Sequence, residues 1–282
     1  MKKTQKIFVD PIMTEEQSDA MAGVFLKETD CHKLITFDAD IFDKATKKCL
    51  AKFRKKVVPG EIQQIAYDSL LIAAASTDNR GTAGGTIKNP YSKKTVNSGI
   101  IGYFDRYPRI PFCRLTAFNQ KHFDKFKDAY PIIKLVDNYY AELMPKEYKR
   151  QRDEADKTSQ DFVIKGTAFT TITVNKNWQT AVHKDAGDFM GGFGNLVAMR
   201  KGNYIGCHLV LVRWGVGFDL QNGDLLLMDV HQWHGNTPMI KQDAKATRLS
   251  LVMYYRADMI KCGSMKDELK IAQNRKRNQK MY

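Results

Sequence analysis

Residues 208–228 read HLVLVRWGVGFDLQNGDLLLM and carry the clearest structural signal in the chain. Three short runs of aliphatic and β-branched residues, at 208–212, 216–220 and 225–228, are separated by turns that contain Gly and Asn. Runs of this length between turn residues are typical of β-strands. The pair Asn222-Gly223 also favours a type I′ hairpin turn, so we expect the strand ending at Leu220 to pair with the strand beginning at Leu225.

The same pattern extends in both directions from this stretch. Further short apolar runs occupy residues 162–164, 169–174, 196–199 and 248–255. Strands at such regular spacing indicate a sandwich or barrel. We therefore expect a mainly β fold with flanking helices (α+β). Its core would be a double-stranded β-helix of the jelly-roll or cupin-like kind, with an N-terminal helical and loop elaboration.

Helical spacing of apolar residues dominates the first half of the chain. One helix is predicted from residue 61 to 75, and a second pattern runs from 120 to 147 with breaks at Pro131 and Pro145. Residues 146–160 are highly charged and predict a helix or linker, whereas residues 78–99, rich in Gly, Asn and Ser, predict a long surface loop. We therefore divide the chain into an N-terminal elaboration (1–99), a double-stranded β-helix domain (100–260) and a basic C-terminal tail (261–282).

The composition is that of a folded, water-soluble protein. Of 282 residues, 43% are hydrophobic and 27% charged, which excludes a disordered, collagen-like or coiled-coil chain. No apolar run approaches the roughly 18 to 20 residues of a membrane helix, and the start lacks the pattern of a signal peptide. The five cysteines, Cys31, Cys49, Cys113, Cys207 and Cys262, occur singly, so we expect reduced thiols in an intracellular protein.

The charge balance points to a polyanionic partner. Lys and Arg exceed Asp and Glu by 14, and basic residues crowd the stretches 44–56 and 275–280. Either stretch is also compatible with a solvated surface or a frayed tail. An excess of this size favours nucleic acid without proving it.

Two histidines and one aspartate form a candidate metal site. In His183-Lys184-Asp185 the outer side chains can project from one face of a strand, and His234 follows the apolar run at 225–228. Two His and one carboxylate occupy one face of an octahedron and leave three positions open, as in non-haem Fe(II) oxygenases. His231 competes for the third position, and we favour His234. A surface ion pair is the alternative for His183 and Asp185.

Arg248 opens an apolar strand 14 residues after His234. An arginine at such a position requires an anionic partner, because burying its charge alone is costly. Its planar guanidinium suits a carboxylate, and 2-oxoglutarate offers a distal carboxylate while its keto acid end binds iron. An internal salt bridge is the alternative.

The ordered blocks His183-x-Asp185, His234-Gly-Asn-Thr-Pro238 and the strand from 247 to 255 resemble the TET and J-binding-protein family. These Fe(II)- and 2-oxoglutarate-dependent dioxygenases oxidise the 5-methyl group of pyrimidines in DNA. The likeness is greatest to bacteriophage and bacterial members and covers about residues 100 to 256. Residues 1–99 match more loosely, through Asp78-Asn-Arg-Gly81. The cysteine-rich zinc-binding insert of the large animal enzymes is absent.

The resemblance implies a role for individual residues. It makes His183, Asp185 and His234 the iron ligands, and Arg248 the clamp on the distal carboxylate of 2-oxoglutarate, with O2 as the second cosubstrate. Further residues implied in the site are Asp188 (contact to the flipped base), Asn175 (keto acid or base), Arg114 (cosubstrate or phosphate), and Phe189 and Phe193 (stacking on the base). The alternatives are a turn-forming role for Asp188 and hydrophobic packing for the two phenylalanines.

The function that follows is hydroxylation of 5-methylcytosine in DNA to 5-hydroxymethylcytosine, with further oxidation open. Asp188 favours this base because a carboxylate can accept a hydrogen bond from the N4 amino group, which thymine lacks. Thymine hydroxylation to 5-hydroxymethyluracil is the close alternative, and hydroxylation of a free metabolite or a protein residue is an alternative of another class. The DNA base would be flipped or single-stranded. We expect a monomer without membrane contact, at the nucleoid of a bacterial or phage-infected cell.

Overall fold

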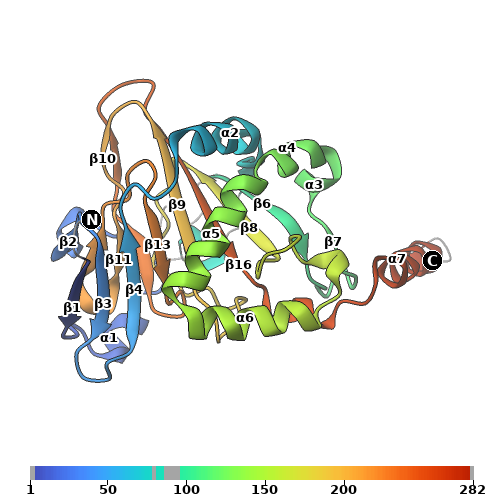
Figure 1. Cartoon of the computed structure of the whole chain (residues 1–282), viewed down its shortest axis with the longest axis horizontal. Helices are drawn as coiled ribbons and strands as arrows, with labels where there is room; N and C mark the ends of the chain where they lie inside the picture. The colour runs from blue at the N-terminus through green and yellow to red at the C-terminus, as the bar shows by residue number, and fades with distance from the viewer. Residues whose placement is uncertain (1–3, 78–80, 86–95, 280–282) are drawn as a thin grey trace.

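A computed structural model, which describes residues 4–77, 81–85 and 96–279, contains two facing β-sheets with helices on the outer side of the larger one (Figure 1). The large sheet has the strand order β1-β3-β4-β13-β9-β16-β8-β6-β5, and β7 pairs with β6. Its strands are β1 (Gln5–Val9), β3 (Ala39–Asp43), β4 (Cys49–Arg54), β5 (Ser76–Thr77), β6 (Val96–Phe104), β7 (Arg114–Leu115), β8 (Thr171–Lys176), β9 (Gly194–Lys201), β13 (Leu225–Met228) and β16 (Thr247–Tyr254).

The small sheet has the order β14-β11-β12-β2, and a two-stranded ribbon joins β10 to β15. These strands are β2 (Lys33–Ile35), β10 (Tyr204–Gly206), β11 (Leu209–Leu211), β12 (Val216–Phe218), β14 (His234–Asn236) and β15 (Met239–Lys241). Apolar side chains of both sheets meet in one core, with Leu211 and Phe218 from the small sheet beside Phe53 and Leu226 from the large one. The double-stranded β-helix core with flanking helices is therefore confirmed.

Helices cover the outer face of the large sheet, and Figure 1 shows α5 and α6 lying across its strands. The helices are α1 (Glu15–Asp19), α2 (Gly60–Leu70), α3 (Ala117–Lys121), α4 (Phe123–Asp128), α5 (Tyr130–Leu143), α6 (Pro145–Lys157) and α7 (Met265–Gln279). Strand β16 separates two environments, because successive side chains of a strand point to opposite faces. Leu249, Leu251 and Met253 pack under the helices. The alternate residues from Arg248 to Tyr254 line a cavity between the sheets.

The predicted hairpin between Leu220 and Leu225 is wrong. Strand β12 pairs with β11 and β2 in the small sheet, whereas β13 pairs with β4 and β9 in the large one. A type I′ turn needs positive φ at both central residues, and here Gly223 has φ of 81° while Asn222 is not among the positive-φ residues. The Asn-Gly turn therefore carries the chain from one sheet to the other.

The N-terminal segment also differs from its prediction. Residues 1–99 were expected to be helical and loop, yet they supply β1, β3 and β4 to the large sheet and β2 to the small one. The predicted loop at 78–99 lies largely outside the described residues, as do the first three positions of Asp78-Asn-Arg-Gly81, but its last residues belong to β6. The predicted strand at 162–164 is absent, because Gln160–Phe162 form a 3₁₀ turn. The C-terminal tail contains α7, which extends away from the body (Figure 1).

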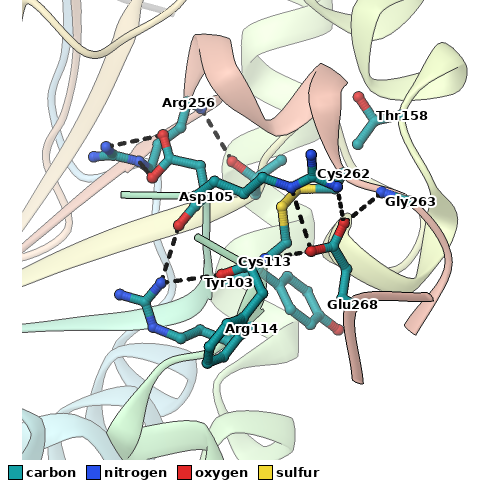
Figure 2. Close-up of a disulfide and its surroundings, with 12 residues drawn as sticks. Tyr103, Asp105, Cys113, Arg114, Thr158, Arg256, Cys262, Gly263 and Glu268 are labelled. Carbon is teal, nitrogen blue, oxygen red and sulfur yellow. Dashed lines mark hydrogen bonds and ion pairs between the residues drawn. A yellow bond between two sulfur atoms is a disulfide. The ribbon is translucent and has the colours of Figure 1, made fainter. Parts of the chain in front are cut away.

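The expectation of reduced thiols is wrong for two of the five cysteines. Cys113 and Cys262 form a disulfide with a Cα–Cα distance of 5.8 Å, while Cys31, Cys49 and Cys207 are free. The pair is separated by 149 residues, so spacing along the sequence could not reveal it. Figure 2 shows this bond close to Asp105, Arg256 and the buried Glu268.

The basic stretch at 44–56 contains β4 and the connection that leads to it from β3. Most of its charges are already paired with acids: Lys44 with Asp10, Lys48 with Asp229, Lys52 and Arg54 with Asp40, and Lys55 with Asp224. Its contribution to binding a polyanion is correspondingly smaller than the sequence suggests. Within the described ranges, no helix combines the length and apolar character needed to cross a membrane.

Candidate metal and cosubstrate site

The backbone brings His183, Asp185 and His234 together at one end of the small sheet. His234 begins β14 and forms an isolated antiparallel bridge with His183, in which each backbone N–H donates to the other residue's carbonyl. Asp185 Oδ1 lies 3.4 Å from His183 Nε2, and its Oδ2 lies 3.7 Å from His234 Nε2. One atom from each of the three residues falls within 4.8 Å of the others, so a single ion can contact all three.

Hydrogen bonds orient both imidazoles for metal binding. His183 Nδ1 lies 2.8 Å from the carbonyl oxygen of Ala181, and His234 Nδ1 lies 2.8 Å from that of Gln232. Since a carbonyl only accepts, Nδ1 must carry the proton in each ring, which leaves the Nε2 lone pair for a metal. Burial and the nearby His183 lower the pKa of His234 to about 4, so its ring is neutral near pH 7. The donor set therefore fits Fe(II) in a two-histidine, one-carboxylate site.

A cavity of about 300 Å³ opens beside these residues, between the two sheets. Arg248 lines it and is only 4% exposed. No salt bridge is formed by Arg248 within the described part of the chain, and its Nη2 has no hydrogen-bond partner there. A buried guanidinium without a counter-ion is unfavourable, so the geometry fits a carboxylate ligand such as that of 2-oxoglutarate and disfavours the internal salt bridge.

Asn175 and Asp188 also line this cavity. Asn175 lies on β8 opposite Ser98 and Ser250, and its Oδ1 accepts a hydrogen bond from the Ser98 hydroxyl. Asp188 is 8% exposed, and its Oδ2 has no partner among the described residues. Burial and the charge of Asp185 raise the pKa of Asp188 well above its usual range, against the opposing effect of Arg256. This shift favours the protonated form of Asp188, in which the carboxyl group could both donate and accept a hydrogen bond.

Arg256 is a cavity residue that the sequence analysis did not single out. Its Nε and Nη2 lie 3.1 Å from the two carboxylate oxygens of Asp105 (Figure 2). Its guanidinium lies over the Phe104 ring, 4.4 Å from the ring centroid. Its backbone forms a bridge with Asp188. The available signal was another arginine two residues past the apolar part of β16, in phase with Arg248 on the same face.

Three predicted site residues lie away from the cavity lining. Arg114 Nη1 donates to the carbonyl oxygens of Asp105 and Phe112, at 3.0 and 3.3 Å. Phe193 is buried in the core under the helices, and Phe189 packs edge-on against Tyr255 at 6.0 Å. The structure does not bring these three residues to the metal site.

His231 does not join the metal ligands. Its Nδ1 lies 3.3 Å from Asp229 Oδ1, and its Nε2 lies 3.3 Å from the backbone carbonyl of Asp188. Both ring nitrogens are thus engaged by oxygen atoms of the protein. His234, which the sequence favoured over His231, is the histidine that lies within reach of His183 and Asp185.

Comparisons with known proteins agree with this site. Residues 99–257 match the family model Tet_JBP, described as the oxygenase domain of the 2OGFeDO superfamily. The chain is 37% identical over 223 residues to thymine dioxygenase JBP1 of Trypanosoma brucei brucei, covering 77% of this chain and 25% of that protein. It is 31% identical over 266 residues to the bifunctional helicase and thymine dioxygenase JBP2 of Leishmania tarentolae, covering 92% and 23%.

A solved structure has the same fold at low sequence identity. NgTET1 in complex with 5mC DNA superposes with a TM-score of 0.63 at 12% identity, covering 97% of this chain and 91% of that one. The chain spans about a quarter of the length of the curated relatives it matches. The expected likeness to bacteriophage and bacterial members stays a prediction. The family model and the relatives together show that the chain belongs to the Tet/JBP family of Fe(II)- and 2-oxoglutarate-dependent dioxygenases.

Proposed function

We propose that this protein hydroxylates the 5-methyl group of a pyrimidine base in DNA, with Fe(II), 2-oxoglutarate and O2. The observation that carries the proposal is one cavity that holds the metal triad, an uncompensated buried Arg248 and an uncompensated buried Asp188. Relatives named thymine dioxygenases and a structural match solved with 5mC DNA support DNA as the substrate. The expected setting is a monomer at the nucleoid of a bacterial or phage-infected cell.

The protein's own groups would bind and orient the reactants. His183, Asp185 and His234 would hold Fe(II), which when bound with 2-oxoglutarate activates O2 for insertion of oxygen into a C–H bond. Arg248 would bind the distal carboxylate and so fix the cosubstrate at the metal. Asp188 would bond the edge of a base extruded from the duplex, because a methyl group in the major groove cannot otherwise reach a buried ion.

Thymine and 5-methylcytosine are both candidate bases, and different observations favour them. The relatives' names favour thymine. An ionised Asp188 would favour 5-methylcytosine, because it can accept from the N4 amino group. The raised pKa of Asp188 weakens that preference, since a neutral carboxyl group can bond the N3 and C4 groups of either base. We therefore place thymine first and 5-methylcytosine second.

The test uses two DNAs in reactions with Fe(II), 2-oxoglutarate and air. One contains thymine with unmethylated cytosine, and the other contains 5-methylcytosine with uracil in place of thymine. Nucleoside mass spectrometry is expected to show one added oxygen on thymine. A gain on 5-methylcytosine alone would reverse the base assignment, and a gain on neither would refute DNA as the substrate.

A metal-ligand variant provides the control for this experiment. Asp185→Ala removes the carboxylate of the triad and is expected to abolish turnover while leaving DNA affinity almost unchanged. DNA affinity is measured separately by fluorescence anisotropy. Retained turnover in Asp185→Ala would contradict the iron assignment.

A further inference from the structure

The turn between β13 and β14 is organised by one buried carboxylate. Asp229 follows Met228 directly and is 3% exposed. Its Oδ2 accepts from Lys48 Nζ at 2.7 Å and from Gln232 Nε2 at 3.0 Å. Its Oδ1 accepts from the backbone N–H of His231 at 3.2 Å. The backbone N–H of Gln232 donates to the Asp229 carbonyl at 3.1 Å, which closes the turn.

His231 ties this turn to the loop that carries Asp185 and Asp188. Its ring is nearly enclosed, with 11% of the side chain exposed, and lies between the Asp229 carboxylate and the Asp188 carbonyl. The backbone N–H of Asp188 donates in turn to the Asp185 carbonyl at 3.1 Å. The His231 ring therefore links the turn to the loop on the other side of the site.

The same turn contacts the metal triad through backbone atoms. The Gln232 carbonyl accepts from His234 Nδ1, which fixes the tautomer of that ligand. The Val230 carbonyl accepts from the Asp185 backbone N–H at 3.0 Å. A shift of this turn would therefore displace His234 and Asp185 together. His183 would move with them because its backbone is bridged to His234.

We infer that Asp229 and His231 are positioning residues that hold the metal triad in its binding geometry. The Asp229 side chain faces three hydrogen-bond donors, which come from the side chains of Lys48 and Gln232 and from the backbone of His231. Position 229 therefore requires a carboxylate, which only accepts. An amide in its place would turn one N–H group toward these donors and leave at least one of them unpaired. Partners of this kind orient metal ligands, and their loss typically weakens metal binding by about 10- to 100-fold.

The chain supplies a matched control at the other end of the same strand. Asp224 precedes β13, is 0% exposed, and accepts from Lys55 Nζ at 2.5 Å and from two backbone N–H groups. It resembles Asp229 in burial and lysine pairing, but its hydrogen-bond donors are Lys55, Lys56 and Gln221, none of which belongs to the turn between β13 and β14. Asp224→Asn therefore reports the cost of removing a buried carboxylate without disturbing the triad.

The experiment measures Co(II) affinity of the full chain without DNA, by the visible absorption of the bound ion, together with the melting temperature of the metal-free protein. Asp229→Asn is expected to weaken Co(II) binding by about 10- to 100-fold, whereas Asp224→Asn lowers the melting temperature and keeps the wild-type affinity. Wild-type affinity in Asp229→Asn, or an equal loss in both variants, would overturn the inference.

A second variant keeps the test decisive if Asp229→Asn does not fold. His231→Phe keeps an aromatic ring at this position but has no ring nitrogen, so it cuts the link between the turn and the loop. It is expected to weaken Co(II) binding in the same direction, and an unchanged affinity would refute the role of His231. The readout contains no DNA, so failure of the proposed substrate leaves this result unaffected.

Discussion

At the scale of single residues, the cavity contains two ionisable groups that burial destabilises unless a ligand compensates them. Arg248 is the clearer case, because its guanidinium is buried with an unpartnered nitrogen. Loss of a hydrogen bond to a charged group costs about 1.5–3 kcal/mol, or roughly 10- to 140-fold in affinity. The energy of cosubstrate binding should therefore depend strongly on the shape of this one side chain.

Arg248→Lys keeps the positive charge but loses the planar pair of N–H groups. We expect the KM for 2-oxoglutarate to rise by roughly 10-fold or more. Steady-state assays at saturating DNA measure this change. Arg200 is the control, because it lies opposite Arg248 in the β9–β16 register and donates to Gln221 and to the Tyr204 carbonyl outside the cavity. An equal rise in Arg200→Lys would argue against a specific carboxylate clamp.

At Asp188, in contrast to Arg248, we expect a conservative substitution to be tolerated. A protonated carboxyl group and a carboxamide both present a donor group beside an acceptor oxygen, so Asp188→Asn should keep turnover within about 10-fold of wild type, which is about 1.4 kcal/mol. Asp188→Leu has neither group and should lose more. The comparison is made on kcat/KM for the DNA substrate. Equal losses in the two variants would show that an ionised carboxylate is required.

At the scale of secondary-structure elements, close backbone approach explains where glycine is required. Gly99 lies on β6, where a Cβ atom would stand 1.8 Å from the backbone oxygen of Ala73. Because that oxygen belongs to the main chain, neither element can yield without breaking strand contacts. Gly60 begins α2, and a Cβ there would meet no atom within 4 Å.

Gly99→Ala is expected to lower the free energy of unfolding by about 1–3 kcal/mol through overpacking. Gly60→Ala should leave it unchanged or slightly higher, because Ala has the better helix propensity. Urea titrations followed by circular dichroism give both values. An unchanged stability in Gly99→Ala would mean that β6 does not lie against residue 73 in solution.

The elements that sequence patterns predicted are those whose apolar residues form uninterrupted or strictly periodic runs. Strands β11, β13 and β16 and helices α2 and α5 belong to this group. Strand β4 was missed because Lys52 and Arg54 alternate with Ala51 and Phe53, so its polar face read as a basic cluster. Both cations pair with Asp40 on β3, and local sequence does not reveal pairing between strands.

The residues of the candidate site also divide into those that the sequence predicted and those that it did not. That His183, Asp185 and His234 lie together, with Arg248 in the same cavity, could be expected because metal and carboxylate binding restrict residue type and spacing, while their roles stay predictions. Arg256 was missed because its position in the cavity depends on its ion pair with Asp105, which lies far away in the sequence. Arg114 was misplaced because its side chain is held by backbone carbonyl oxygens outside the cavity. Contacts of this kind exist only once the tertiary structure has formed.

At the scale of the whole molecule, the net charge of +14 predicts how DNA binding responds to salt. Lys and Arg side chains that contact phosphates release counter-ions, so the logarithm of affinity should fall linearly with the logarithm of salt concentration. Anisotropy titrations at several salt concentrations test this expectation. An affinity independent of salt would favour a free metabolite or a protein as the substrate.

The disulfide between Cys113 and Cys262 connects the β6–β7 region to the C-terminal segment. Loop closure over 149 residues restricts the unfolded chain, and such bonds typically contribute about 2–4 kcal/mol. The same two segments are also joined by Glu268, which accepts from the backbone N–H groups of Cys113 and Gly263 (Figure 2). Glu268 also accepts from Arg106. Reduction should therefore cost stability without releasing the segment.

A reducing agent is accordingly expected to lower the free energy of unfolding of the wild-type protein by about 2–4 kcal/mol. The double variant Cys113→Ser, Cys262→Ser should match the reduced protein and show no response, while Cys31→Ser should respond like wild type because Cys31 is free. Turnover should persist in all of them, since the ion pair between Arg256 and Asp105 keeps this side of the cavity in place. Five titratable thiols in the untreated protein would contradict the bond, and loss of turnover on reduction would show that the bond itself positions Arg256.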